Sequence, residues 1–549
     1  MVPLPVGAKQ PLYCLNAGDA AIMKQLLRRA YPDLTSIPSA ELLPEPRMHM
    51  KRLPVVPPWP PGHVSRPLAA HELHGAPPQQ LQPTDALRPD ATLEDVVAAQ
   101  TALLAALPAL REARDAQPST RNGRSLIVFL PWLVIGGAEK FALNVIAEFT
   151  ALGWHATVVL SLDSTGFGGN RWEQVARTYT DDIFVVPSMV DRHFYGALVC
   201  NLVASRGVEA AIATNSAQPY LFLPYFKAAC PINTFIDVSH NWIDAWIDGG
   251  YTAFGLGFMA EMDYSMAISD VLRRKMVAEG GDESKLRTIY IGTNATFFTH
   301  TPVADRAAAI LAPGPAFLPE HRDAFAGLLA RGNKRVVVFV GRMSGEKQPH
   351  VFVDAIVRAR ASLPPGVADS LAAVMVGGGY MLDNVQAHIA AAGAGGFLMA
   401  VGPLDEHGTR DILNVADIMM MTSETEGTPL ALFEAMSMGL ACIAPAVGGI
   451  PEMLTVDTGH LVVNTGLSQD AQADAFAAAL VKLLSMPEDD VRGMGAAAAV
   501  RVREKFDTRI MAQQLQGLMD DNRHAAATKR SNSGGISLGA YLQALRLAS

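Results

Sequence analysis

Short runs of consecutive apolar residues alternate with longer amphipathic segments along the chain from Ser125 onward. Such runs, bounded by glycine, proline or polar residues, are typical of strands buried on both faces of a parallel sheet, with helices between them. In the first half of this region the pattern predicts a helix at Gly137–Leu152. The predicted strands are Ser125–Pro131, His155–Leu162, Ile183–Pro187, Ala210–Asn215, Ile232–His240, Ser265–Ser269 and Leu286–Gly292.

The same alternation starts again after a variable stretch at residues 301–332. Strands are predicted at Val336–Gly341, Ala372–Gly379, Phe397–Gly402, Ile418–Ser423 and Ala441–Ala446. Helices are predicted at Pro349–Ser362, Ser468–Leu484, Glu488–Phe506 and Thr508–Asn522. Because strands alternate with helices in both halves, we predict two Rossmann-like α/β domains at residues 125–300 and 301–505. Residues 506–549 should form a C-terminal helix that packs back on the first domain, and a polar tail.

Residues 1–124 have a different composition, with proline clusters at Leu53–Pro67 and Ala76–Pro83. Proline fixes φ and lacks a backbone donor, so these clusters are unsuited to the interior of a sheet or helix. Helices are predicted at about Asp19–Ala30 and Thr92–Leu107. We interpret this segment as an N-terminal extension outside the two domains.

The 549 residues are 50% hydrophobic and 18% charged, a composition that favours large cores over global disorder. The formal net charge of −9 argues against a nucleic-acid binder. The chain start lacks a signal-peptide pattern, and no apolar run reaches the ~18 residues that cross a bilayer. We therefore expect a cytoplasmic protein, with peripheral contact to the inner face of a membrane left open. The cysteines, expected to be reduced and buried, are Cys14, Cys200, Cys230 and Cys442.

An acidic pair, Glu426 and Glu434, follows one predicted strand of the second half. Glu426 lies in the loop and Glu434 on the helix that follows, where Thr428 suits the N-cap and Pro429 the first turn. The free amides at this helix start, near Leu430, would attract a diphosphate. The two carboxylates would accept hydrogen bonds from sugar hydroxyls. Taken alone, such a glutamate pair is also compatible with solvated or capping side chains.

Two cations follow another predicted strand of the second half, in the segment from Gly341 to Lys347. A glycine at a strand exit lets the backbone approach a ligand. Arg342 and Lys347 could neutralise a leaving diphosphate. Without further context, two basic residues in a loop are more often solvated surface.

Two weaker motifs lie in the first half. Gly136 and Gly137 follow the first predicted strand, and their amides could bind phosphate, although they match neither the GxGxxG nor the Walker pattern. His240 ends an apolar strand and could orient a substrate hydroxyl or share a proton. For each, a purely structural role is the alternative.

Together and in this order, the motifs resemble the family 4 retaining glycosyltransferases of the GT-B fold, the glycosyl transferases group 1. The resemblance covers about Ser125 to Asn522. Its most specific parts are the two glutamates, with seven residues between them, and the spacing of Arg342 and Lys347. Its other segments are Gly136-Gly137-Ala138-Glu139, His240, Ala267-Ile268-Ser269, Ile291-Gly292-Thr293-Asn294 and Gly448-Gly449-Ile450-Pro451-Glu452.

The resemblance implies an acceptor domain and a nucleotide-sugar donor domain that face each other across a cleft. It implies that Arg342 and Lys347 hold the donor diphosphate and that Glu434 binds the ribose. Glu426 would contact the transferred sugar, with His240 beside it, and these two are the catalytic candidates. The remaining members of the implied donor-binding set are Gly137, Gly341, Thr428, Pro429 and Leu430.

The activity implied is transfer of a sugar from a UDP or GDP donor to a hydroxyl of a saccharide or lipid-linked acceptor, with retained configuration, in cell-surface polysaccharide synthesis. Neither a metal nor another cofactor is expected, because no Asp-x-Asp site lies near these motifs. Thr428-Pro429-Leu430 stands where many members have Gly-Phe-Gly, which leaves the donor sugar open. The alternatives are a nucleotide-sugar epimerase and a non-catalytic nucleotide-sugar binder or scaffold. The oligomeric state is not predicted.

Overall fold

The structure is a computed structural model of the chain. It describes residues 124–532, apart from 135, 163–171, 189–197, 200–201, 204–205, 217–218, 221–231, 244–248, 313–318 and 332–334. The two helices predicted in the N-terminal extension lie outside the described residues, as do Cys14, Cys200 and Cys230.

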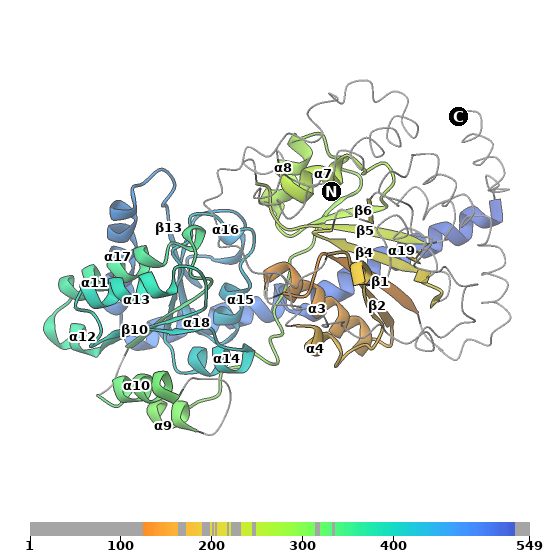
Figure 1. The fold of residues 1–549 in the computed structure, drawn as a ribbon. Coiled ribbons are helices and arrows are strands. Elements are labelled where there is room, and N and C mark those ends of the chain that lie inside the picture. The colour runs from red at the N-terminus through yellow and green to blue at the C-terminus, as the bar shows by residue number, and fades with distance from the viewer. Residues whose placement is uncertain are drawn as a thin grey trace, which may run out of the picture. The chain divides into compact units, whose positions relative to one another are not determined.

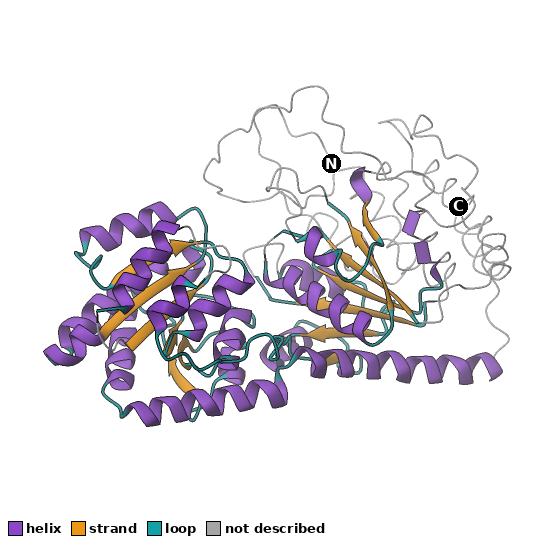
Figure 2. Ribbon diagram, turned by 90° about the horizontal axis from the view of Figure 1, so that it is seen from below, coloured by secondary structure: helices purple, strands orange, loops and turns teal. Residues whose placement is uncertain are grey.

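The described residues form two parallel sheets, each with helices packed around it (Figures 1 and 2). This confirms the predicted class of two parallel-sheet α/β domains. The elements of the first half are β1 (Ser125–Leu130), α3 (Gly137–Ala151), β2 (His155–Leu160), α4 (Glu173–Ala176), β3 (Ile183–Val185), a 3₁₀ turn η4 (Val186–Ser188), β4 (Ala210–Thr214), β5 (Thr234–Ser239), α7 (Gly250–Leu256), β6 (Tyr264–Ala267), α8 (Asp270–Ala278) and β7 (Leu286–Thr288).

The first sheet has the strand order β3-β2-β1-β4-β5-β6-β7. Central β1 runs parallel to both neighbours, with Ser125 opposite His155 on β2 and Leu126 opposite Ala210 on β4. All residues of β1, β4 and β5 are buried. Burial on both faces explains why these strands read as continuous apolar runs.

The second sheet has the order β10-β9-β8-β11-β12-β13. The helices and strands of the second half of the chain are α9 (Arg306–Leu311), α10 (Pro319–Leu329), β8 (Arg335–Val340), a 3₁₀ turn η6 (Gly345–Lys347), α11 (Pro349–Ser362), α12 (Pro365–Ser370), β9 (Leu371–Val376), α13 (Leu382–Ala391), β10 (Leu398–Gly402), α14 (Glu406–Asn414), β11 (Ile418–Met420), α15 (Leu430–Ser437), β12 (Ala441–Pro445), α16 (Ile450–Met453), β13 (Gly459–Val462), α17 (Gln469–Leu484), α18 (Glu488–Lys505) and α19 (Thr508–Asn532). The order matters for the site, because β8 lies between β9 and β11.

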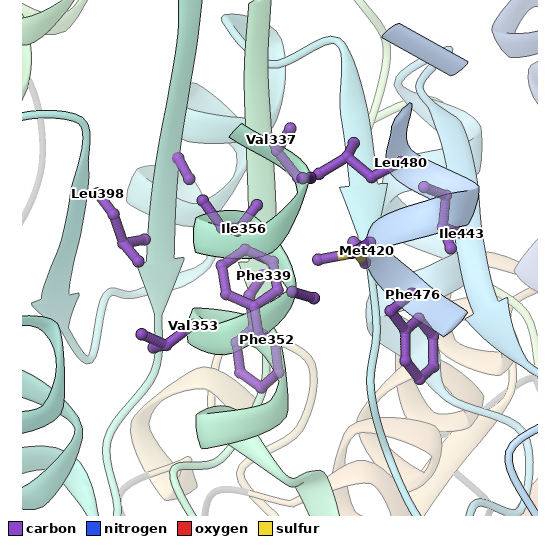
Figure 3. Packing of buried hydrophobic residues seen from close by; sticks show 14 of the residues in the cluster. Val337, Phe339, Phe352, Val353, Ile356, Leu398, Met420, Ile443, Phe476 and Leu480 are labelled. Atoms are coloured by element: carbon purple, nitrogen blue, oxygen red, sulfur yellow. The ribbon is translucent and has the colours of Figure 1, made fainter. Parts of the chain in front are cut away.

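One face of the second sheet packs against α11, α13 and α17 in a continuous apolar cluster. Successive side chains of a strand point to opposite faces, so Val337 and Phe339 of β8 face these helices together. Phe339 contacts Phe352 of α11 edge-to-face, with ring centroids 5.4 Å apart, and Figure 3 shows the two rings within the cluster. This packing fixes the strand ends from which the candidate site loops extend.

The described residues form two compact units, of which the second comprises Met266–Gly280 and Leu286–Gln516. The second unit thus includes α8, whereas the predicted boundary near residue 300 assigned it to the first domain. The first unit includes residues 517–532. There Asp520 of α19 pairs with Arg124. The predicted domain limits, and the cleft implied by the resemblance, stay predictions.

Candidate functional site

The loop after β8 carries both predicted cations, and a short 3₁₀ turn positions Lys347. This turn, η6 (Gly345–Lys347), ends at Lys347, and α11 starts at Pro349. Between them Gln348 adopts a left-handed backbone, with φ 46° and ψ 55°. This conformation is uncommon for a residue with a side chain, and such outliers concentrate at functional sites. The turn directs Lys347 toward the neighbouring strand end.

The exit of β11 holds this turn in place by backbone and hydroxyl hydrogen bonds. Thr422 Oγ1 donates to the carbonyl oxygens of Lys347 and Gln348, at 3.3 and 3.0 Å. The amide of Glu424 donates to the carbonyl oxygen of Glu346 at 2.9 Å. Two loops that are distant in sequence are therefore fastened together at the carboxyl ends of β8 and β11.

Lys347 and Glu426 meet at this junction. The Lys347 ammonium donates to both carboxylate oxygens of Glu426, at 2.7 and 2.8 Å. Ser423 Oγ donates to Oε1 of the same carboxylate at 2.7 Å. The Glu426 side chain is only 6% exposed and that of Lys347 is 24% exposed, so the pair is screened poorly by water. The structure thus brings together two predicted site residues and adds Ser423, which had no predicted role.

Arg342 points into solvent beside this pair of loops. Its side chain is 60% exposed, and Nη1 lies 3.9 Å from Oε1 of Glu346. The same Glu346 oxygen accepts a hydrogen bond from Ser344 Oγ at 2.6 Å. An exposed ion pair of this length contributes little, so the guanidinium can exchange it for an anionic ligand. Gly341, just before Arg342, continues the backbone pairing with β9 through its amide to Val376 O at 3.0 Å.

The start of α15 differs from the prediction by one residue and in its cap. The helix begins at Leu430, and Pro429 occupies the N-cap position with no side-chain cap bond. The predicted capping role of Thr428 is wrong, because its Oγ1 instead donates to the carbonyl oxygen of Ile268 at 3.2 Å. Glu434 lies half-buried on the second turn of α15. Its position relative to a ribose stays a prediction.

Gly448 and Gly449 lie against the backbone that carries Glu426. The amide of Gly449 donates to Gly427 O at 2.7 Å. Gly448 has a left-handed φ of +53°, and a Cβ there would overlap the carbonyl oxygen of Glu426. A side chain is therefore excluded at Gly448 both by backbone conformation and by space. The two glycines of this segment position the Glu426 loop by close backbone contact.

In the first unit, Gly137 is exposed at the start of α3. The buried Glu139 on the same turn accepts a hydrogen bond from Trp132 Nε1 at 3.0 Å. This bond ties α3 to the loop that follows β1. A phosphate-binding role for Gly137 stays a prediction.

His240 follows β5 and is almost completely buried. Its Nε2 lies 2.7 Å from Thr214 Oγ1 on neighbouring β4, and its ring contacts Phe141 of α3 edge-to-face at 5.3 Å. Burial lowers the pKa of His240 to about 4, because the charged imidazolium is poorly solvated there. The ring is therefore neutral near pH 7. The role of His240 toward a substrate stays a prediction.

We expect His240 to make the stability of the first unit depend on pH. The folded-state pKa lies below the usual value of 6.5, so the contribution is present above pH 6.5 and is lost as pH falls toward 4. Between about pH 7.5 and about pH 5 the loss should reach about 2 kcal/mol. Urea unfolding of His240→Gln should show a smaller fall over this range than the wild-type protein. Equal falls in the two proteins would contradict the buried neutral state.

Glu452 of α16 caps α8 from a distant part of the sequence. Its carboxylate accepts hydrogen bonds from the amides of Asp270 and Val271, at 2.8 and 2.7 Å, and from Tyr290 Oη at 2.7 Å. Carboxylates stabilise helix starts by satisfying free amides. Burial and the bond to Glu452 raise the pKa of Tyr290, which keeps its hydroxyl protonated as a donor. The Glu452 contacts explain why α8 belongs to the second unit.

Replacing Glu452 by glutamine should lower the free energy of unfolding by about 1–2 kcal/mol, because two helix-end amides lose a charged acceptor. The urea midpoint, followed by circular dichroism, measures this change. Asp457→Asn is the matched control, since Asp457 is an exposed carboxylate in the same unit. Equal midpoints for the two variants would contradict the capping role.

Among the described residues, no group of three or more His, Cys, Asp or Glu side chains is arranged to hold a metal ion. No helix in the described ranges is both long and apolar enough to cross a bilayer. Cys442 on β12 is buried as a thiol, as expected of a small hydrophobic residue, and burial raises its pKa well above the usual range.

Comparison with known proteins supports the two-sheet architecture and gives a family match within the second unit. Residues 321–499 match the family model described as glycosyl transferases group 1. The Anabaena protein Alr3699/HepE, solved in complex with UDP, aligns with 72% of this chain and 100% of its own, with a TM-score of 0.56 and 16% identity. At that identity the likeness is one of fold, and it extends over both sheets.

Curated relatives match over shorter stretches. The amylovoran biosynthesis glycosyltransferase AmsK of Erwinia amylovora is 34% identical over 114 residues, which is 20% of this chain and 26% of AmsK. A D-inositol 3-phosphate glycosyltransferase of Streptomyces griseus is 28% identical over 256 residues, 45% of this chain and 52% of that protein. The chain thus aligns with about half or less of these relatives' length. Residues 321–499 are therefore similar to the glycosyl transferases group 1 family, and the two sheets share the fold of the Anabaena structure solved with UDP.

Proposed function

We propose that this protein is a retaining glycosyltransferase that moves a sugar from a UDP or GDP donor to a hydroxyl of a saccharide or lipid-linked acceptor. The observation that carries the proposal is the contact of Lys347 with Glu426 at 2.7 and 2.8 Å. It joins a cation suited to a diphosphate to a carboxylate suited to sugar hydroxyls. A donor bound here would have its diphosphate at the cation and its sugar at the carboxylate.

The reaction breaks the bond between the anomeric carbon and the diphosphate oxygen, and forms a bond from the same carbon to the acceptor oxygen. Lys347 and Arg342 neutralise the charge that develops on the leaving diphosphate. The acceptor proton passes to a diphosphate oxygen, on the same face of the sugar from which the diphosphate leaves. His240, neutral near pH 7, orients a sugar hydroxyl and takes no proton.

The names of similar proteins support the setting of the proposal. The structurally similar Anabaena protein was solved with UDP, and AmsK takes part in amylovoran biosynthesis. We therefore propose UDP as the first donor base to test and cell-surface polysaccharide synthesis as the setting. We also propose that the reaction needs no metal.

A donor screen tests the function directly. The purified full chain is heated with each of a panel of UDP- and GDP-sugars, and a true donor raises Tm by mass action. The stabilising donor is then incubated with saccharide and lipid-linked acceptors, with and without a chelator, and the anomeric configuration of the product is read by NMR. Stabilisation without transfer to any acceptor would favour a nucleotide-sugar binder. A changed sugar in the absence of acceptor would favour an epimerase.

A further inference from the structure

Tyr380 exposes its aromatic ring beside the loop that carries Lys347. It directly follows β9 and Gly377–Gly379. Its side chain is 77% exposed, more than any other tyrosine, phenylalanine or tryptophan in the described part of the chain. Its hydroxyl nonetheless accepts a hydrogen bond from the amide of Gly345, at 2.8 Å. One end of the ring is therefore fixed at the start of η6, while its faces remain in water.

The loop that carries Tyr380 is itself held against the Lys347 loop. The amide of Met343 donates to Gly378 O at 2.8 Å, and the amide of Met381 donates to Met343 O at 3.0 Å. Gly379 has a φ of +148°, and a Cβ there would overlap Met343 O. The aromatic ring is thus preorganised, so little additional conformational entropy is lost when a ligand stacks on it.

The strand order places Tyr380 and Glu426 on opposite sides of Lys347. Tyr380 follows β9, Lys347 follows β8 and Glu426 follows β11, and the sheet order is β9-β8-β11. Neighbouring strands lie about 4.8 Å apart. A donor with its diphosphate at Lys347 and its sugar at Glu426 therefore extends its nucleoside toward the β9 side, where the exposed ring lies.

We propose that Tyr380 is a stacking platform for the nucleobase of the donor. The inference rests on the donor-binding function proposed above and adds the residue that receives the base. Every nucleobase has an aromatic face, so the platform binds uracil and guanine alike and leaves the choice of base to other groups. Tyr380 then contributes affinity for the nucleoside and none for the diphosphate.

Calorimetric titration of the full chain with UDP, GDP and inorganic pyrophosphate separates these contributions. Tyr380→Ala should weaken UDP and GDP by roughly 5- to 100-fold, the range for loss of one aromatic stack, and should change pyrophosphate affinity by less than about 2-fold. Tyr380→Phe keeps the ring and should bind UDP within about 3-fold of the wild type. Tyr179→Ala, at a tyrosine of the first unit that is 40% exposed, is the matched control and should bind all three ligands normally.

Two results would overturn the platform while leaving the proposed function intact. Unchanged UDP affinity in Tyr380→Ala would show that the base does not contact the ring. Equal weakening of UDP and pyrophosphate would show that Tyr380 only positions the Lys347 loop. If the wild-type protein binds neither UDP nor GDP, the donor-binding function itself fails, and the inference fails with it.

Discussion

Replacing Lys347 by alanine is expected to lower kcat/KM for sugar transfer by about 10²- to 10³-fold, the usual cost of removing one preorganised group that faces developing charge. The same substitution leaves the Glu426 carboxylate, only 6% exposed, without its cation. We therefore also expect the free energy of unfolding to fall by about 1–3 kcal/mol. Steady-state kinetics with the donor from the screen and urea unfolding measure the two effects separately.

The double variant Lys347→Ala with Glu426→Gln separates catalysis from structure. Neutral glutamine removes the unpaired charge, so stability should return in part, whereas activity should stay low because both contacts to the donor are missing. Lys275→Ala is the matched control, because Lys275 forms an exposed pair with Glu279 at 2.7 Å on α8. Exposed pairs contribute little, so this control should keep both activity and stability. Recovery of activity together with stability in the double variant would show that the pair is structural.

The apolar runs predicted most of the fold because burial leaves a strong pattern in parallel strands. Helix α11 was predicted with its observed limits, Pro349–Ser362, since Pro349 marks its start. The edge strand β13 was missed, because Gly459–Val462 is short and two of its four residues are only partly buried. The cap of α15 was misassigned, because the Thr428 hydroxyl forms a tertiary hydrogen bond to the carbonyl oxygen of Ile268. No local sequence pattern predicts that bond.

The site shows the same division between local and long-range information. The residues of the two loops were predicted from local motifs at strand ends. Their contact was not, since Lys347 and Glu426 are 79 residues apart and meet only because β8 pairs with β11. Glu452 and Asp270, which it caps at the start of α8, are likewise 182 residues apart, and their contact joins α8 to the second unit. Strand order and such long-range caps are set by packing of the whole sheet, which a single sequence does not display.

A change at Gly448 should reduce transfer nearly as much as a change at Lys347, although no atom of Gly448 need touch the donor. A Cβ there would overlap the carbonyl oxygen of Glu426, so Gly448→Ala must shift the Glu426 loop. A displacement of about 1 Å at a reacting group can cost about 10²-fold in rate. We expect kcat to fall by roughly that factor, measured with the same donor and acceptor as above.

The backbone strain of this substitution needs its own control, because alanine is also disfavoured at a φ of +53°. Gly466→Ala provides it: Gly466 has a φ of +78° in the same unit, and a Cβ there would meet nothing within 4 Å. Both variants should lose about 1 kcal/mol of stability from the left-handed backbone, but only Gly448→Ala should lose activity. If the two variants retain the same kcat, the close approach of Gly448 to Glu426 does not position that carboxylate for transfer. If only Gly448→Ala is slow, Gly448 acts on the reaction through the backbone of Glu426.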